Sequence, residues 1–327
     1  MEKAYKFRLY PNKEQELIIQ KTFGCCRFVY NHYLARRIEL YKEDKSTMNY
    51  NACSADLKEF KKSFEWLKEI DSVSLQSSIK DLDTAYQNFF REVKKGNSNQ
   101  GFPKFKSKKN NHKSYKTKYT NGNIQVLDKN IKLPKLGLVK AKVSRGLEGR
   151  IINATISQEP SGKYFVSICC TEVPKPQTIK TGAIVGIDLG IKEFAITSDG
   201  QHIENPKYLR KAEKKLARLQ KELSRKTIGS SNRNKARIKV ARQHEKIANQ
   251  RKDFLHKTST QLIQDYDIIC LETLKVKNMI KNHKLAKAIN DVSWSEFVRQ
   301  LQYKSDWNDK IVQQIDSYFA SSQLCSV

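Results

Sequence analysis

Two acidic residues stand where buried strands would end, and carboxylates in such positions can hold metal ions. The run AIVGIDLGIKEFAITSDG over residues 183–200 predicts a strand that ends at Asp188, a tight turn at Gly190 and a second strand. The run DIICLE over residues 267–272 predicts another short apolar strand, which ends at Glu272. Either acid alone would more often be a turn or capping residue. Together they favour a site where acids hold divalent ions for cleavage of a phosphodiester.

The charge of the chain indicates a polyanionic partner. Its 327 residues contain 62 Lys and Arg against 34 Asp and Glu, which gives a net charge of +28 and a pI near 9.7. Basic residues occur in every segment, as expected for extended coverage of a nucleic acid. No apolar run approaches the roughly 20 residues of a membrane span, and the N-terminal MEKAYKFRLY is no signal peptide. We therefore expect a soluble, cytoplasmic protein with no membrane partner.

The seven cysteines predict reduced thiols and no zinc site. They stand at positions 25, 26, 53, 169, 170, 270 and 325, and no two are spaced as Cys-X-X-Cys. An odd number of cysteines, several of them in apolar patterns, fits a cytosolic protein.

Residues 97–118 form a very basic segment in which lysines alternate with aromatic residues and no acid occurs. A run of charge is usually a solvated face or a loop. Aromatic rings among the lysines instead favour a loop that contacts phosphates and stacks on bases. The residues that we predict to bind nucleic acid here are Lys104, Phe105, Lys106, Lys108, Lys109 and Tyr115.

A long helical hairpin is predicted between the two acidic strands. Leu209, Leu216 and Leu223 recur every seven residues after Pro206, and TIGSSNRN at 227–234 breaks the pattern before a second helix from about 235 to 264. The outer faces are basic, either for solubility alone or for contact with nucleic acid. We favour contact because we see no acids that alternate with the cations of this face. The predicted contacts are Arg225, Lys226, Arg233, Arg237, Arg242, Lys246 and Arg251, with Lys281 and Lys284 in the basic connector after Glu272.

The first half of the chain predicts a small antiparallel barrel interrupted by helices. KAYKFRLY at 3–10 alternates bulky and basic residues as a half-exposed strand does, and short strands follow between residues 123 and 173. Strands this short and closely spaced suggest a barrel that the N-terminal strand joins. The Pro- and Thr-rich TEVPKPQTIKT at 171–181 then marks a domain boundary.

Several segments together resemble the TnpB family of transposon-encoded, RNA-guided DNA nucleases, which are related to type V CRISPR effectors. The resemblance runs nearly end to end and rests on KAYKFRLYPNKEQ, GFPKFKSK, GIDLGIKEFAITSDG, the hairpin segment SRKTIGSSNRNKARIKVARQHEKIANQRKDFLHKTS, NHKLAKAINDVSWSEFVRQLQYKSDW and SSQLCS. It implies an α/β multidomain fold. A wedge-type barrel (1–10 and 97–173) would hold a helical recognition insertion (11–96). A linker (174–182) would lead to a RuvC-like, ribonuclease-H-like domain (183–327) with the hairpin 206–265 inserted. The implied partners are a guide RNA and a double-stranded DNA target beside a short adjacent motif.

Asp188 and Glu272 match the first two catalytic acids of that family, and no residue matches the third. In the family the third acid lies beyond a zinc ribbon, and Cys325 matches the first cysteine position of that ribbon. We therefore expect a truncated RuvC-like domain without zinc. Two divalent ions need several carboxylates to offset their repulsion, and two acids leave that charge under-compensated, which disfavours Mg²⁺ binding here. The late acids that could replace the third, an outcome we do not expect, are Asp306, Asp309 and Asp316.

These observations predict an RNA-guided, double-stranded DNA-binding protein without nuclease activity. Such a protein would not be an enzyme; it would occupy a promoter in the bacterial nucleoid and repress transcription. The alternative is a fragment or decayed copy of a TnpB endonuclease, which the two matching acids favour. A non-specific RNA-binding accessory protein would explain the charge but not the paired acidic strands. The sequence does not specify the guide, the target gene or the oligomeric state.

Overall fold

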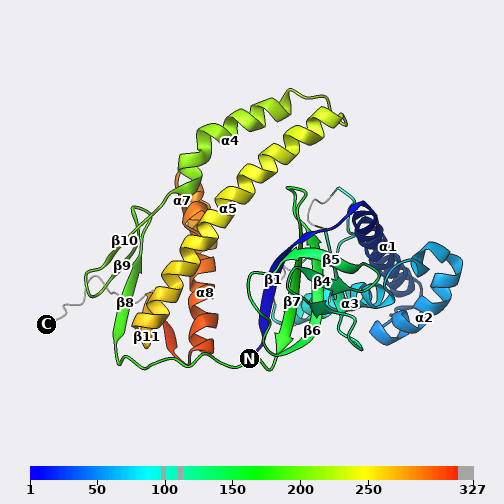
Figure 1. Ribbon diagram of the computed structural model, residues 1–327, viewed down its shortest axis with the longest axis horizontal. Helices are drawn as coiled ribbons and strands as arrows, with labels where there is room; N and C mark the ends of the chain where they lie inside the picture. Colours follow the sequence, from blue (N-terminus) through cyan, green and yellow to red (C-terminus); the bar gives the residue numbers. More distant parts are fainter. Residues whose placement is uncertain (97–100, 110–112, 316–327) are drawn as a thin grey trace. The chain divides into compact units, whose positions relative to one another are not determined.

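The computed structural model describes residues 1–96, 101–109 and 113–315, which form two units (Figure 1). The first unit is Met1–Pro174, and the second begins at Lys175. Each unit contains its own β-sheet and its own apolar core. The α/β class predicted from the sequence is thereby confirmed. None of the helices in the described ranges is long and apolar enough to span a membrane.

A seven-stranded antiparallel sheet forms the centre of the first unit. The N-terminal strand β1 lies between β7 and β5, with Lys3 opposite Cys170. Its side chains alternate as the sequence predicts, with Tyr5, Phe7 and Leu9 buried. The strands are β1 (Lys3–Tyr10), β2 (Lys113–Lys118), β3 (Gln125–Val126), β4 (Asn130–Leu133), β5 (Gly137–Lys142), β6 (Arg150–Gln158) and β7 (Tyr164–Thr171), in the order β2-β6-β7-β1-β5-β4-β3.

Helices between β1 and β2 share one apolar core with this sheet. In the capping box of α1, the side chains of Asn12 and Gln15 each accept a hydrogen bond from the other residue's backbone N–H. The carboxylate of Asp71 caps α3 and also accepts a hydrogen bond of 2.6 Å from the Thr117 hydroxyl on β2. Asp71 therefore fixes the start of α3 to the sheet. The helices are α1 (Lys13–Asp44), α2 (Tyr50–Ser63), the 3₁₀ helix η1 (Glu65–Lys68) and α3 (Ser72–Lys94).

The second unit contains a five-stranded mixed sheet in the order β10-β9-β8-β11-β12. Strands β8, β9 and β10 form an antiparallel meander, whereas β11 runs parallel to both β8 and β12. The carboxyl ends of β8, β11 and β12 therefore lie at one edge of the sheet. The strands are β8 (Ile184–Leu189), β9 (Glu193–Thr197), β10 (His202–Glu204), β11 (Ile268–Glu272) and β12 (Ile311–Ile315).

Parallel strands need long crossovers, and both crossovers of this sheet are helical. The first leads through α4 (Tyr208–Ser224) and α5 (Ser231–Asp265), which form a hairpin that projects from the sheet in Figure 1. The second contains α6 (Val276–Met279), α7 (His283–Val292) and α8 (Trp294–Trp307). Apolar side chains of α5 and α8 join the sheet in one core, among them Leu262 and Phe297. This packing anchors the base of the hairpin.

Candidate active site

Asp188 and Glu272 lie on neighbouring strands at the carboxyl edge of the second sheet. The parallel register pairs Leu271 with Ile187, so the next residues in register are Glu272 and Asp188. Both acids follow a buried residue, and because side chains alternate along a strand they share one face. Asp188 is exposed and Glu272 is partly exposed. Neighbouring strands are about 4.8 Å apart, which puts the two carboxylates within reach of one metal ion.

Two of the late acids lie at the opposite edge of this sheet. Strand β12 runs parallel to β11, so the residues that precede it lie at the amino edge. Asp309 is there, in an ion pair with Lys175, and Asp306 is in the last turn of α8 just before it. Neither acid can therefore join Asp188 and Glu272 in one metal site.

Two further residues named in the metal-site prediction, Asp316 and Cys325, lie outside the described residues. Within the ranges that the structure describes, no three His, Cys, Asp or Glu side chains form a group that could hold a metal ion.

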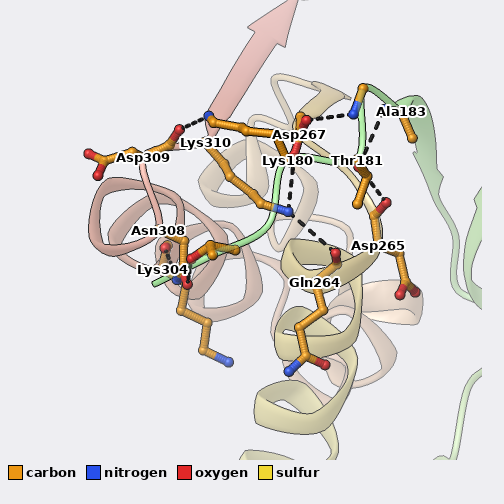
Figure 2. Close-up of polar contacts among 12 residues, drawn as sticks. Lys180, Thr181, Ala183, Gln264, Asp265, Asp267, Lys304, Asn308, Asp309 and Lys310 are labelled. Atoms are coloured by element: carbon orange, nitrogen blue, oxygen red, sulfur yellow. Dashed lines mark hydrogen bonds and ion pairs between the residues drawn. The ribbon is translucent and has the colours of Figure 1, made fainter. Parts of the chain in front are cut away.

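A polar cluster at the amino edge fixes the register that brings the two acids together (Figure 2). Asp267, directly before β11, accepts a hydrogen bond of 2.7 Å from the N–H of Gly182, two residues before β8. Its other oxygen lies 3.2 Å from the Nζ of Lys310, which is buried directly before β12. The Gly182 N–H, with help from the Lys310 ammonium, lowers the pKa of Asp267 to about 2. One charged side chain thus ties together the starts of β8, β11 and β12.

A second buried lysine, Lys304, joins α8 to α5. Its Nζ donates to the carbonyl oxygen of His256 at 2.9 Å and to the hydroxyls of Ser259 and Thr260 at 2.7 Å each. No acid pairs with it within the described residues, and its burial lowers its pKa to about 8. The ammonium therefore holds two helices of the core together, at an electrostatic cost at neutral pH.

Two of the predicted hairpin contacts, Arg233 and Arg251, are partly buried and also bind groups of the protein itself, and their contact with nucleic acid stays a prediction. Arg233 donates to two carbonyl groups at the end of α4, at 3.0 and 2.8 Å, and so caps that helix. Arg251 lies 2.8 Å from Asp291 of α7, which also accepts a hydrogen bond of 3.0 Å from the N–H of Leu209 at the start of α4. Both arginines position the hairpin. Arg237 is partly buried and has a partner of its own. The cations predicted here that stay exposed are Arg225, Lys226, Arg242, Lys246, Lys281 and Lys284.

The basic segment 101–109 is exposed except at Pro103, and it is attached to α1. Asn31 of α1 forms hydrogen bonds of 2.8 and 3.0 Å with the backbone N–H and carbonyl of Lys106. The Lys106 ammonium lies 4.0 Å from the centre of the Tyr30 ring. Phe105 is 57% exposed, which leaves its ring free to stack. The other predicted contacts in this segment, Lys104, Lys108 and Lys109, are also exposed.

Tyr115 is buried, which corrects its assignment as a base-stacking residue. It is only 7% exposed, and its ring packs edge-on against Phe23 with 5.7 Å between the centroids. Burial also raises the pKa of its hydroxyl. The alternation of strand β2 turns this ring toward the core, whereas the lysines of the same strand face solvent or lie at its rim.

The sequence reasoning missed several cations that the fold gathers around Lys284. They line one cavity between the β8–β9 turn, α4 and α7, namely Lys192, Lys207, Arg210 and Lys287. The sequence contains a pattern that could have identified two of these positions. The first turns of α4 and α7 carry Arg210 and Lys284 and contain no acid, although a helix start favours negative charge.

Comparison with solved structures gives the class of fold. The chain is similar to the Cas12f1 chain of a Cas12f1–sgRNA–target DNA complex, with a TM-score of 0.58 over 97% of this chain and 89% of that chain. The two sequences are 11% identical, so the likeness concerns the fold alone.

Comparison of sequences gives the family. Residues 167–283, which include Asp188 and Glu272, match the family described as "Probable transposase". A relative from Streptomyces pristinaespiralis is 39% identical over 330 residues, covering 99% of this chain and 80% of the relative. InsQ from Escherichia coli K12 is 36% identical over 341 residues, covering 99% of this chain and 82% of InsQ. Both carry the provisional name of RNA-guided DNA endonuclease. The chain belongs to the TnpB family, as its motifs predict.

A second family match concerns the N-terminal residues. Residues 1–46 match a family described as "Helix-turn-helix domain". In the structure this range contains the strand β1 and the single 32-residue helix α1. The description therefore does not fit the arrangement of these residues, since no turn interrupts α1.

The relatives contradict the prediction that the chain is not an enzyme. They are named as endonucleases, and the segment that matches the transposase family contains both acids. The prediction took the unmatched third acid as loss of the metal site. That inference was too strong, because Mg²⁺ is often held by one or two carboxylates together with water and substrate phosphates.

Proposed function

We propose that this protein is an RNA-guided DNA endonuclease whose second unit is a RuvC-like nuclease domain. The observation that carries the proposal is the register of β8 and β11, which puts Asp188 beside Glu272 at one sheet edge. The order of the five strands supports it, because an antiparallel meander followed by two parallel strands is the arrangement expected of a ribonuclease-H-like sheet. The provisional names of the relatives support it as well.

The acid pair fits Mg²⁺, which prefers carboxylate oxygens and completes its shell with water and phosphate oxygens. Asp188 and Glu272 would hold the ion, which when bound lowers the pKa of water and neutralises charge on the phosphate. The chain's own contribution is to hold both carboxylates rigidly on paired strands. Asp267 and Lys310 secure that alignment from the other end of the strands.

Recognition of the nucleic acids is proposed for the exposed cations of both units. In the first unit, the segment 101–109 offers lysines for phosphates and Phe105 for stacking. In this proposal the first unit is a wedge-type barrel (1–10 and 97–173) with a helical insertion (11–96). In the second unit the hairpin offers Arg225, Lys226, Arg242 and Lys246. Guide RNA pairing would supply sequence specificity, and the protein would contact the backbone and a short motif beside the target.

The test is cleavage of matched double-stranded DNA by the protein assembled with the guide RNA of its host element and Mg²⁺. The wild type should cut the matched target and leave a mismatched one intact. Asp188→Asn and Glu272→Gln should each lower the cleavage rate roughly a hundredfold or more, because metal-assisted charge stabilisation contributes several kcal/mol. Both variants should bind guide and target as the wild type does.

Glu204→Gln on β10 is the matched control, since it removes an exposed acid of the same sheet. Its cleavage rate should equal that of the wild type. Uncut DNA with a matched guide and Mg²⁺, or full activity of Asp188→Asn, would refute the proposed nuclease.

A further inference from the structure

The second unit contains a cavity of about 610 Å³ between the β8–β9 turn, the start of α4 and α7. Its walls are held together by contacts between these elements, including an ion pair of Glu213 on α4 with Lys287 on α7. The hydrogen bond from the Leu209 N–H to Asp291 adds a second link between the same helices. A cavity of this volume lies in the range of ligand-binding pockets.

Cations without partners dominate the walls of this cavity. Two acids also line it, and both are already paired, Glu213 with Lys287 and Asp291 with Arg251. Within the described part of the chain, four lining cations have no acidic partner, namely Lys192, Lys207, Arg210 and Lys284. Like charges that face one space repel one another, so the folded chain gains from an anion placed between them.

The local backbone does not favour cations at these positions either. Arg210 and Lys284 stand in the first turns of α4 and α7, where the helix dipole favours acids. Lys207, which precedes α4, has a positive φ of 49° that is uncommon for a lysine. The positive charge of the cavity therefore has no explanation in helix stability.

Part of the cavity wall is apolar, and this favours a nucleic-acid strand over a simple anion as the ligand. Leu285 is 44% exposed, and Ile191 and Leu209 line the same cavity. A phosphate ion would gain nothing from such a surface. A single strand offers both a charged backbone and flat bases or sugars that can cover apolar side chains.

One residue that lines the cavity is close in sequence to the acid pair. Lys192 follows Asp188 by four residues through the β8–β9 turn, which limits the distance between their Cα atoms to about 14 Å. The turn bends back on itself, because the Gly190 N–H donates to the Phe194 carbonyl at 3.3 Å. A nucleic-acid strand bound to these cations can therefore extend to Asp188 and Glu272.

We propose that this cavity binds the phosphate backbone of the single DNA strand that is delivered to Asp188 and Glu272, with one nucleoside against Leu285. The proposal rests on the proposed nuclease function and adds Lys192 and Lys284 as positioning residues. These lysines hold phosphates beside the scissile bond and take no part in the bond change.

The first experiment is cross-linking, which needs no cleavage. A photoreactive benzoylphenylalanine replaces Leu285 in the Asp188→Asn protein, and each DNA strand or the guide RNA is labelled in turn. We expect a cross-link to one DNA strand, and none from the same group at Ala217, an exposed α4 residue that does not line the cavity. A cross-link to the guide RNA alone, or to no nucleic acid, would overturn the proposal.

The second experiment is single-turnover cleavage by the double variant Lys192→Gln/Lys284→Gln. Its rate should fall about tenfold because misplaced phosphates lower the rate of a positioned reaction. Affinity for guide and target should stay unchanged, the melting temperature should not fall because two repelling charges are removed, and Lys192→Arg/Lys284→Arg should restore the rate. The matched control is Lys211→Gln/Lys214→Gln, two exposed lysines of α4 that do not line the cavity.

The two experiments separate failure of this inference from failure of the proposed function. If the Lys192→Gln/Lys284→Gln variant cuts DNA as fast as the wild type, the cavity assignment is refuted and the proposed nuclease function still stands. A DNA cross-link from position 285, together with a wild-type protein that does not cut matched DNA, supports the strand-binding cavity and refutes the nuclease.

Discussion

Replacing Lys304 by Met should remove a pH dependence from the stability of the second unit. In the folded chain, burial lowers the pKa of Lys304 to about 8 from its ordinary 10.5. Its three hydrogen bonds go to a carbonyl and two hydroxyls of α5, so no negative charge compensates the ammonium there. Burial also lowers the pKa of the neighbouring His256, which is therefore neutral across the alkaline range.

The direction and size of the effect follow from proton binding. Below pH 8, Lys304 is charged in the folded and unfolded chains alike, and the cost of its burial is fully present. Between about pH 8 and pH 10.5 the unfolded chain binds more protons, so the free energy of unfolding rises with pH. Each unit of pKa difference corresponds to about 1.4 kcal/mol. From about pH 7 to about pH 9.5, Lys304 should therefore add about 2 kcal/mol to the free energy of unfolding.

The assay is urea unfolding followed by tryptophan fluorescence. The chain has three tryptophans, and Trp66→Phe leaves Trp294 and Trp307 to report on the second unit alone. In this background we expect the difference between wild type and Lys304→Met to change by about 2 kcal/mol across the stated pH range. Lys215→Met, at an exposed position of α4, should show no such change. A difference that stays constant with pH would refute the account of Lys304 as a buried, uncompensated cation.

Three further predictions concern the nucleic-acid contacts and the first unit. Arg251→Ala leaves the nearly buried carboxylate of Asp291 without its ion-pair partner and should lower the free energy of unfolding by about 3 kcal/mol. Arg242→Ala, at an exposed position, should change the free energy of unfolding by no more than about 0.5 kcal/mol and should weaken RNA binding. Urea unfolding measures the stability of each variant, and a binding titration measures its affinity for RNA. Phe105→Ala should weaken binding of single-stranded RNA about tenfold, and Tyr115→Phe should not, as fluorescence anisotropy would measure. Gly149→Ala should destabilise the first unit by about 3 kcal/mol, because its φ is +78° and a Cβ would lie 2.2 Å from the Thr171 carbonyl oxygen; equal melting temperatures would contradict this.

The sequence determined the elements that carry the chemistry. Short apolar runs that end on acids predicted the strands of Asp188 and Glu272, because burial and strand length are encoded locally. Net charge is a property of composition and does not depend on the fold, so the composition alone predicted a polyanionic partner.

Only the tertiary structure decided which of these residues meet. The register of β8 and β11, set from the far edge by Asp267 and Lys310, brings two acids together that are 84 residues apart in the sequence. The sequence showed Arg251 as one cation among many, and the fold pairs it with Asp291, which lies 40 residues away. Local pattern gives the face of an element on which a side chain lies, but its partner depends on packing between elements distant in sequence. For that reason the partners of Arg233 and Arg251 and the cationic cavity follow from the fold, whereas the acidic strands follow from the sequence.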